Sequence, residues 1–501
     1  MLKNGGKYLG IIILSLMLLF LITACDSGSS GDVLESETYS SSLKIGYLEE
    51  DELSALSVSA GEEVFTDLKE NYQDGFVNLD LLGLEGEVDI TIKHPDFDLT
   101  EEEFKISSKD DKQAKEVYIK NIIVDKTEEK RYVFSEVESD LQKTNHKFVF
   151  YPGEYNFDED LTIDKTGVKL VSKTDEFETL INFASEKYMK IAADDITVDG
   201  FKMNIIKDKA GARYAIQINS DRKEININNC DFNGIQFQNN ITEVTLDNNI
   251  IRDTIYEGIY IGENNSEIEI LNNEFYDNSR DLEDLGESGF YSIAVHEGSS
   301  NVLLENNYIR DNYAMGIRLI EAEAEIKNNK IKNNEYAGIY LEQNSSATIK
   351  NNEIINNGRP GIYLGGESSA IIENNLIKSN QTYGITLDTN SKADIYYNEI
   401  VDNNNLNLLL FSEETAAETN INNNNIYYDA LNKNLSLAIE DDENNYTDNK
   451  LKAKNNWWGV DNLKEAADSE YNIVNDAGDT VLEGNVDYLP FKSAKIEEAG
   501  I

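Results

Sequence analysis

The chain carries an internal repeat with a period of 23 residues, which constrains its fold more strongly than any other feature. Four consecutive frames between Gly316 and Ile400 read GIRLIEAEAEIKNNKI, GIYLEQNSSATIKNNEI, GIYLGGESSAIIENNLI and GITLDTNSKADIYYNEI. An asparagine at the same place in each frame recurs at Asn329, Asn352, Asn375 and Asn398. A period in the twenties indicates a solenoid, in which one repeat cannot bury its apolar face without its neighbours.

Within each frame the apolar residues alternate with polar ones, as in Ile339-x-Leu341 and Ile362-x-Leu364. Alternation with a period of two is typical of β-strands and not of helices. Three short strands with tight corners fit into 23 residues. We therefore predict an all-β chain in which each frame forms one coil of a parallel β-helix, with coils stacked about 4.8 Å apart.

The corner asparagines form a longer series than the four regular frames. The same slot recurs, with steps of 19 to 34 residues, at Cys230, Asn249, Asn273, Asn307, Asn329, Asn352, Asn375, Asn398, Asn424 and Asn456. An asparagine tolerates left-handed corner geometry, and its amide can bond to the asparagine of the next coil. We expect these residues to hold corners, and Cys230 to be a buried packing residue.

Two stretches carry a resemblance to a known superfamily. FVFYPGEYNFDEDLTI (148–163) resembles the entry coil of right-handed β-helix proteins of the pectate-lyase-like superfamily, and Asn455-Asn456-Trp457-Trp458-Gly459 resembles their final coils. Residues 147–460 as a whole resemble right-handed parallel β-helices built of PbH1 repeats. The resemblance implies a right-handed β-helix over 147–462 and a C-terminal cap over 463–501. The two tryptophans are expected to cover the core, a sugar platform being the alternative.

A different pattern precedes the repeats. Short alternating segments such as LKIGYL, GFVNLDLL and EVDITIKH fill residues 43–124, and Asp74-Gly75 predicts a hairpin turn. Asp74-Gly75-Phe76-Val77 and His94-Pro95-Asp96-Phe97 resemble a carboxypeptidase-regulatory-like β-sandwich. The resemblance implies a small sandwich that serves as a spacer, joined to the solenoid by a connector over 125–146.

The N-terminus resembles an export signal. Lys3 and Lys7 precede an apolar core, and Ile22-Thr23-Ala24-Cys25 resembles the lipobox of bacterial lipoproteins. We predict a signal peptide over 1–24, lipid attachment at Cys25 and a flexible tether over 25–42. The mature protein would then be extracytoplasmic, lipid-anchored to the bacterial cell membrane or outer membrane. An ordinary signal peptide with an incidental cysteine is the alternative.

The formal net charge of −50 restricts the partners. So acidic a chain repels nucleic acid and anionic lipid, so nucleic acid is excluded and membrane contact is expected through the lipid anchor only. The carboxylates allow calcium, but no calcium repeat, zinc spacing or phosphate loop supports a metal or cofactor. Adaptation to high salt is a second explanation of the acidity. Protein partners stay unspecified.

One outward face of the solenoid carries the candidate binding residues. If Ile339 and Leu341 point inward, the residues beside them point outward. The substrate-binding candidates in these outward columns are Gln236, Tyr260, Tyr340, Glu342, Tyr363 and Asp388. Tyrosine rings can stack on sugars, and the polar groups can bond to hydroxyls. The alternative is that β-propensity alone places tyrosines there.

The candidate catalytic residues are His296, Arg318 and Tyr291, beside an insertion over 278–288. A neutral histidine or tyrosine can move protons, and an arginine can stabilise a carboxylate or enolate. SGFYSIAVHE (288–297) resembles a short stretch of mannuronan C5-epimerases, although Ala294-Val295 replaces the family's Asp-Pro. The resemblance implies β-elimination or C5 epimerisation of a uronic acid; a non-catalytic surface histidine is the alternative.

Three functional hypotheses follow. The superfamily is rich in carbohydrate-binding proteins and in sugar hydrolases, lyases and epimerases, which implies an envelope lipoprotein whose β-helix binds, or also processes, a polysaccharide. The second hypothesis is a non-enzymatic adhesin or structural envelope scaffold. The third is an accessory protein for metal-centre maturation, against which the shortage of His and Cys counts. Whether the chain is an enzyme is left open.

Overall fold

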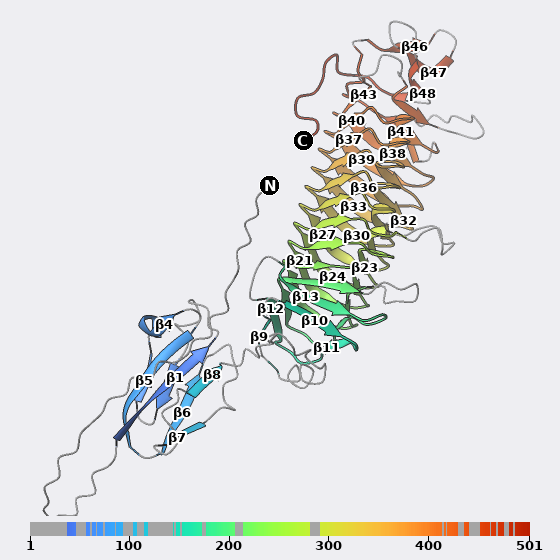
Figure 1. Cartoon of the computed structure of the whole chain (residues 1–501). Coiled ribbons are helices and arrows are strands. Elements are labelled where there is room, and N and C mark those ends of the chain that lie inside the picture. The colour runs from blue at the N-terminus through green and yellow to red at the C-terminus, as the bar shows by residue number, and fades with distance from the viewer. Residues whose placement is uncertain are drawn as a thin grey trace, which may run out of the picture.

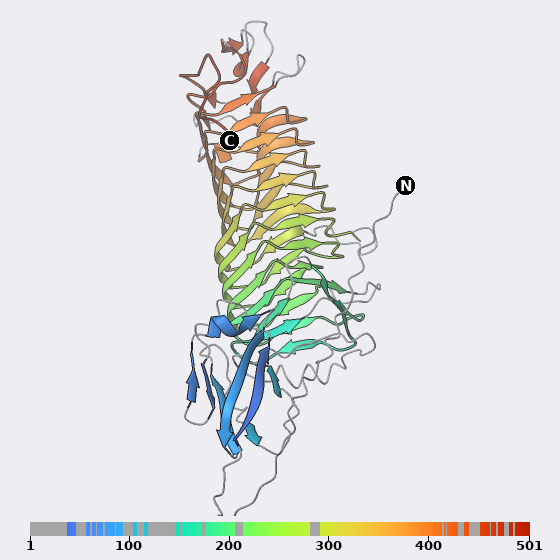
Figure 2. The same cartoon turned by 60° about the vertical axis from the view of Figure 1, so that its left-hand side comes forward.

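The structure is a computed structural model of the 501-residue chain (Figures 1 and 2). It describes residues 38–46, 57–60, 63–66, 68–73, 76–85, 87–93, 104–107, 115–118, 144, 147–150, 153–172, 177–205, 214–280, 291–412, 415–416, 418–428, 435–439, 451–460, 462–466, 469–474, 480–483 and 486–501. The predicted signal peptide, Cys25 and most of the predicted tether lie outside these residues.

The N-terminal strands form two four-stranded sheets. One sheet has the order β4 (Tyr72–Gln73), β5 (Phe76–Glu85), β1 (Thr38–Gly46), β8 (Lys115–Tyr118); the other has the order β3 (Glu63–Phe65), β2 (Ser57–Ala60), β6 (Glu87–Lys93), β7 (Phe104–Ser107). A 3-10 helix, η2, spans Leu68–Asn71. Gln73 pairs with Phe76, which confirms the predicted hairpin. β1 begins at Thr38, so strand structure starts before the predicted boundary at 43. The carboxypeptidase-regulatory-like resemblance stays a prediction.

The rest of the chain forms a rod of stacked coils, each visiting three parallel sheets in the same order (Figures 1 and 2). The 12-stranded sheet contains β10 (Gly153–Phe157), β13 (Thr179–Phe183), β16 (Phe201–Ile205), β19 (Asp231–Phe232), β22 (Ile250–Arg252), β25 (Glu274–Tyr276), β28 (Tyr308–Arg310), β31 (Lys330–Lys332), β34 (Glu353–Ile355), β37 (Leu376–Lys378), β40 (Glu399–Val401) and β43 (Asn425–Tyr427).

The 15-stranded sheet contains β11 (Leu161–Ile163), β14 (Met189–Ile191), β17 (Ile216–Ile218), β20 (Ile235–Phe237), β23 (Ile259–Ile261), β26 (Tyr291–Val295), β29 (Met315–Ile320), β32 (Ile339–Glu342), β35 (Ile362–Leu364), β38 (Tyr383–Leu387), β41 (Leu406–Leu410), β44 (Leu437–Ile439), β48 (Thr480–Glu483), β47 (Ser469–Val474) and β46 (Lys464–Ala466).

The 14-stranded sheet contains β9 (Lys147–Phe150), β12 (Lys169–Ser172), β15 (Ile196–Asp199), β18 (Lys223–Asn228), β21 (Thr242–Asp247), β24 (Ser266–Leu271), β27 (Ser300–Glu305), β30 (Glu323–Lys327), β33 (Ser346–Lys350), β36 (Ser369–Glu373), β39 (Lys392–Tyr396), β42 (Asn420–Asn422), β45 (Leu451–Lys452) and β49 (Val486–Asp487). The prediction of an all-β chain built on a parallel β-helix is confirmed.

The core of the rod consists of apolar files that run along its axis. Ile339 pairs with Ile362 and that residue with Ile385, and all three side chains are fully buried. Each isoleucine buried in this way contributes about 1.5–3 kcal/mol to folding. Each regular frame begins with a glycine just before the inward isoleucine, as in Gly338-Ile339. The close stacking of the coils requires this glycine, because a Cβ on Gly338 would lie 2.7 Å from the carbonyl oxygen of Gly361.

The predicted asparagine ladder is confirmed. The backbone N–H of Asn352 donates to Oδ1 of Asn375 at 2.8 Å, and its side-chain amide donates to the same oxygen at 3.0 Å and to the carbonyl of Ile326 at 2.8 Å. Cys230 begins the series, since its N–H donates to Oδ1 of Asn249 at 2.9 Å. Burial raises the pKa of the Cys230 thiol to about 12, so this cysteine is an unreactive packing residue.

The left-handed corner is not made by the ladder residue, contrary to the prediction. It belongs to the residue before it: φ is 58° at Asn328, 56° at Asn351 and 55° at Asn374. The two adjacent asparagines therefore divide the work, because the first tolerates the left-handed backbone and the second satisfies buried backbone groups.

A second ladder, which the sequence analysis missed, runs five residues after the first. Its members are Asn278, Asn312, Asn334, Asn357, Asn380 and Asn403, and each donates to the next along the rod. These residues are fully or almost fully buried. The short strands of the 12-stranded sheet are thus bracketed by an asparagine ladder at both ends.

The C-terminal residues do more than cover the end of the rod. β48 adds to β44 in parallel, and β47 and β46 then continue the 15-stranded sheet antiparallel. The final segment runs back along the rod, where the N–H of Lys492 donates to Asn456 O, that of Ile496 to Asn425 Oδ1 and that of Gly500 to Tyr397 O. The C-terminus accordingly lies beside β37 and β40 (Figure 1).

The tryptophans lie at this end of the rod. Trp458 is 2 % exposed, and the ring of Trp457 lies 4.8 Å from that of Tyr427. Trp458 belongs to the hydrophobic core, as expected, whereas Trp457 is half-buried and lies outside the core cluster.

Candidate functional site

The outward columns predicted from the sequence are in register in the 15-stranded sheet. Consecutive partners along the first column are Gln217, Gln236, Tyr260, Ala294, Arg318, Tyr340, Tyr363 and Thr386. The second column lies two residues further along each strand. It includes His296 on the coil of Ala294, Glu342 on the coil of Tyr340 and Asp388 on the coil of Thr386. The residue type changes along most of the first column, although Gln217 is followed by Gln236 and Tyr340 by Tyr363.

Arg318 is the centre of the face. Its guanidinium donates to the hydroxyl of Tyr291 and to the carboxylate of Glu342, and it lies 4.2 Å from the centre of the Tyr291 ring. The side chains of Arg318 and Glu342 are each 19 % exposed. Burial lowers the pKa of Arg318 to about 10, against the opposing effects of Tyr340 and Glu257, and raises the pKa of Glu342. The arginine stays charged at neutral pH, and the ion pair opposes both shifts.

Tyr340 and Tyr363 form the next unit along the rod. Their rings stack face to face, with centroids 4.5 Å apart and an interplanar angle of 10°. The hydroxyl of Tyr363 donates to Asp388 at 2.5 Å. Burial raises the pKa of both phenols, and the bond to Asp388 adds to the shift of Tyr363. Because each ring covers a face of the other, these tyrosines offer a ligand mainly their edges and outer faces.

His296 lies apart from the arginine cluster. Its ring packs against that of Tyr260 at 4.5 Å, and burial lowers its pKa, so the imidazole is neutral at neutral pH. Among the described residues, His296 shares no hydrogen bond with Arg318 or Tyr291. The structure therefore brings two of the three predicted catalytic residues into contact and places the third against a predicted binding residue.

Glu257 is a member of the site that the sequence analysis missed. Its carboxylate accepts a 2.6 Å hydrogen bond from Tyr214. Burial raises the pKa of Tyr260 and the charge of Glu257 adds to that shift, while the same charge opposes the lowering of the pKa of Arg318. A signal was present in the sequence. The residue before the corresponding glycine is Met315, Ala337, Pro360 or Tyr383 in the four regular frames, and it is charged in this coil.

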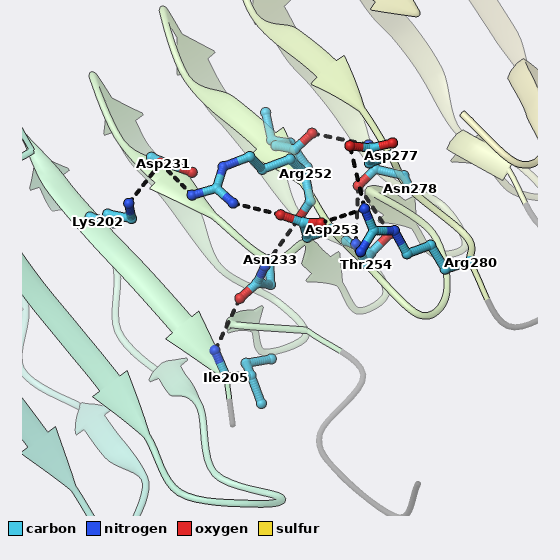
Figure 3. Close-up of polar contacts among 11 residues, drawn as sticks. Lys202, Ile205, Asp231, Asn233, Arg252, Asp253, Thr254, Asp277, Asn278 and Arg280 are labelled. Atoms are coloured by element: carbon cyan, nitrogen blue, oxygen red, sulfur yellow. Dashed lines mark hydrogen bonds and ion pairs between the residues drawn. The ribbon is translucent and has the colours of Figure 1, made fainter. Parts of the chain in front are cut away.

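The insertion beside the site begins from a paired ionic network on the 12-stranded sheet (Figure 3). Arg252 contacts Asp231 at 2.8 Å and Asp253 at 2.6 Å, and Arg280 contacts Asp253 at 3.0 Å. Residues 281–290 lie outside the described residues. These charges pair with one another, so we assign the network a structural role.

The outer face of the 14-stranded sheet contains a separate hollow of about 660 Å³. Its lining includes Leu303, Glu325, Thr348, Ile371 and Asp394, one from each successive coil. It contains none of the predicted site residues.

Neither a metal site nor a membrane-spanning helix is found in the described part of the chain. No group of three or more His, Cys, Asp or Glu side chains there could hold a metal ion. No helix within the same residues is long and apolar enough to cross a bilayer.

Three solved structures illustrate what the fold is similar to. A mutant of the periplasmic alginate epimerase AlgG has 14% identity and a TM-score of 0.44, over 59% of this chain and 76% of its own. The A-module of the Azotobacter vinelandii mannuronan C-5 epimerase AlgE6 has 14% identity and a TM-score of 0.40, over 54% and 90%. The catalytic domain of a GH87 α-1,3-glucanase, in complex with tetrasaccharides, has 11% identity and a TM-score of 0.45, over 80% and 85%.

With TM-scores below 0.5, these likenesses carry no argument about this chain. No curated protein matches the sequence. The sequence model of the right-handed β-helix region family matches residues 196–334 and 292–475, which together exceed half of the 501 residues. The chain therefore belongs to the right-handed β-helix family.

Proposed function

We propose that the outer face of the 15-stranded sheet binds a polysaccharide laid along the rod axis. The observation that carries the proposal is the contiguous file from Gln236 to Thr386, with Asp388 two residues beyond it. Every side chain of the file except that of Ala294 is polar or aromatic, and the residue type changes at every step except from Tyr340 to Tyr363. Coils about 4.8 Å apart present these groups at regular intervals, which suits an extended polymer better than a compact small molecule.

The polar groups of this face are not fully satisfied within the protein. The buried side-chain atoms of the outward column without a partner in the described residues are Arg318 Nε and Thr386 Oγ1. Both residues belong to strands of the 15-stranded sheet and point to its outer face. A buried polar group left unpaired costs about 1–3 kcal/mol, so ligand hydroxyls or water, after small side-chain movements, would be favoured partners.

The geometry supports binding more directly than catalysis. β-Elimination or epimerisation of a uronic acid would use Arg318 to hold the substrate carboxylate, and here Glu342 and Tyr291 occupy the guanidinium. A neutral His296 is in the right protonation state for a general base. The lyase or epimerase role of these residues stays a prediction, as does the alternative of a non-enzymatic adhesin or scaffold.

The cellular setting of the proposal is the cell envelope. The charged start, the apolar core and the Ile22-Thr23-Ala24-Cys25 sequence support export and lipid attachment. Expression with an alkyne-tagged fatty acid should label the wild-type protein and not Cys25→Ser. Equal labelling of the variant would remove the lipid anchor from the proposal.

Affinity electrophoresis of residues 26–501 through gels that contain neutral and acidic glycans tests the binding face. At least one glycan should retard the protein. The double change Tyr340→Ala/Tyr363→Ala should abolish most of that retardation. Tyr308→Ala is the matched control, because Tyr308 is 38 % exposed on the 12-stranded sheet. Equal loss in the control, or no retardation by any glycan, would favour the scaffold. Ultraviolet absorbance of an unsaturated product would reveal a lyase.

A further inference from the structure

We infer that the ligand of this face is an uncharged glycan and that polyuronates are rejected. The inference rests on the proposed function and names its substrate class. Uronate chains carry one carboxylate per sugar, and proteins bind carboxylates best with the paired N–H donors of arginine. The described part of the rod shows which arginines are free to bind a substrate carboxylate.

The described arginines are almost all paired with the protein's own carboxylates. Arg222 contacts Asp194 at 3.4 Å, Arg252 contacts Asp231 at 2.8 Å, Arg280 contacts Asp253 at 3.0 Å and Arg310 contacts Glu274 at 2.8 Å. Figure 3 shows two of these side chains within one network. Arg359 is exposed and forms no ion pair with a described residue; it lies over the ring of Tyr336, two residues before Gly361 and outside the outward columns. Arg318 is the arginine within the outward columns of the binding face.

Arg318 is itself neutralised. One nitrogen of its guanidinium donates to Glu342, another donates to Tyr291, and the third, Nε, is buried without a partner. A substrate carboxylate would have to displace Glu342, whose own charge would then be half-buried and unpaired. Leaving a charge in that state is strongly unfavourable. The ion pair therefore acts as a filter against anionic sugars.

Carboxylates also line the edge where the strands of this sheet end. Glu263, Glu297, Glu321 and Glu367 follow β23, β26, β29 and β35, and all four are exposed. None of them forms an ion pair with a described residue. Asp388 lies on the same side of the face, beside Tyr363. Among the outward residues of the described strands from β14 to β41, Lys190 on β14 is the single lysine. It lies three coils from Tyr260.

The overall charge of the chain also disfavours the binding of an anionic glycan. A net charge of −50 repels a polyanion over a distance set by the ionic strength, about 30 Å at 0.01 M and 8 Å at 0.15 M. An uncharged polymer meets no such barrier, and its hydroxyls can bond to amides, phenols and carboxylates alike.

Polymer pairs that share a backbone and differ in charge test the inference. Polygalacturonate and its methyl ester, alginate and its propylene glycol ester, and carboxymethylcellulose and hydroxyethylcellulose form three such pairs. Retention of residues 26–501 would be measured by affinity electrophoresis at low and at physiological salt. For any backbone that binds, the uncharged form should be retained at least about tenfold more strongly at low salt, and the ratio should narrow as salt screens the repulsion.

The double change Glu342→Gln/Asp388→Asn should reduce the discrimination, since it frees Arg318 and removes two charges from the face. Circular dichroism would establish that the variant is folded. Tighter binding of the anionic form by the wild-type protein would overturn the inference and leave the proposed function standing. Equal binding of both forms at low salt would also overturn it. Retention of no glycan, charged or neutral, would instead overturn the proposed function.

Discussion

The 12-stranded sheet with its two asparagine ladders and the outer face of the 15-stranded sheet are built on the same coils in the same register, yet their side chains follow opposite rules. In the ladders the same residue recurs at each coil, and every amide bonds to the amide above it. On the outer face Tyr260, Ala294, Arg318 and Tyr340 follow one another. Tyr260 packs on His296, Arg318 bonds to Glu342 and Tyr291, and Tyr340 stacks on Tyr363.

The difference separates structure from function. A buried backbone group has the same requirement at each coil, so repetition meets it at each coil. A surface that repeats has no distinct place for a ligand, whereas one that varies does. The predictions below test this division, from the largest expected effect to the smallest.

Removing one ladder residue should cost the most. Asn352→Ala removes the side-chain amide bonds to Asn375 and Ile326 and leaves the N–H of Asn329 without its acceptor. Several buried groups lose partners together, so we expect a loss of about 3 kcal/mol or more in the free energy of unfolding. Denaturant unfolding with hydrogen exchange would measure the loss and locate it.

Asn351→Gly is the control in the same coil. Asn351 has a φ of 56°, which glycine adopts freely, so the change should cost little. An equally large loss would show that the two adjacent asparagines do not divide their tasks.

Arg318→Met should have the next largest effect, a loss of about 2 kcal/mol in the free energy of unfolding, because it leaves the half-buried Glu342 without its counter-charge. Burial raises the pKa of Glu342 in the folded state, so the folded protein binds this proton more tightly than the unfolded chain does, and stability from this group falls as pH rises. The loss in the free energy of unfolding caused by Arg318→Met should therefore be larger at pH 8 than at a pH near the ordinary pKa of glutamate.

The double change Arg318→Met/Glu342→Gln should recover part of the stability lost in Arg318→Met. Thermal unfolding across pH would measure both variants. A penalty that does not depend on pH, with no recovery in the double variant, would mean that the pair contributes packing and not charge.

Tyr363→Phe should have a smaller effect on stability, about 1 kcal/mol, because it removes the bond to Asp388 and keeps the ring stacked on Tyr340. Its effect on glycan retention is the sharper test. The loss should be several-fold if the hydroxyl and Asp388 contact the ligand. Unchanged retention would confine the ligand to other coils.

Lys495→Ala should change stability least, by about 0.5 kcal/mol or less. Lys495 contacts Glu399 at 2.6 Å, but its side chain is 47 % exposed, and exposed ion pairs contribute little. Denaturant unfolding in low and high salt would measure it. A loss above about 1 kcal/mol would show that the C-terminal segment clamps the last coils through this contact.

The repeat made the fold predictable because periodicity and stacking are linked. The spacing of Asn329, Asn352 and Asn375 predicted the coil, the ladder and the outward register, and the structure has all three. The left-handed corner was assigned to the wrong asparagine of the pair, because adjacent residues share the period and sequence cannot separate their backbone angles. The second ladder was overlooked for a related reason, since asparagine is so common in the repeats that a second column did not stand out.

The candidate site was predictable as a face and not as a set of contacts. Sequence alone determined which residues share the outward columns, because alternation along a strand and the coil period fix the face and the neighbouring coil. Only the tertiary structure decided that Arg318 bonds to Glu342 and Tyr291, that Tyr340 covers Tyr363, and that His296 turns to Tyr260. Those contacts depend on side-chain rotamers and burial. The repeat period fixes which coil is the neighbour, but each side chain can reach several residues on the coil before it and on the coil after it.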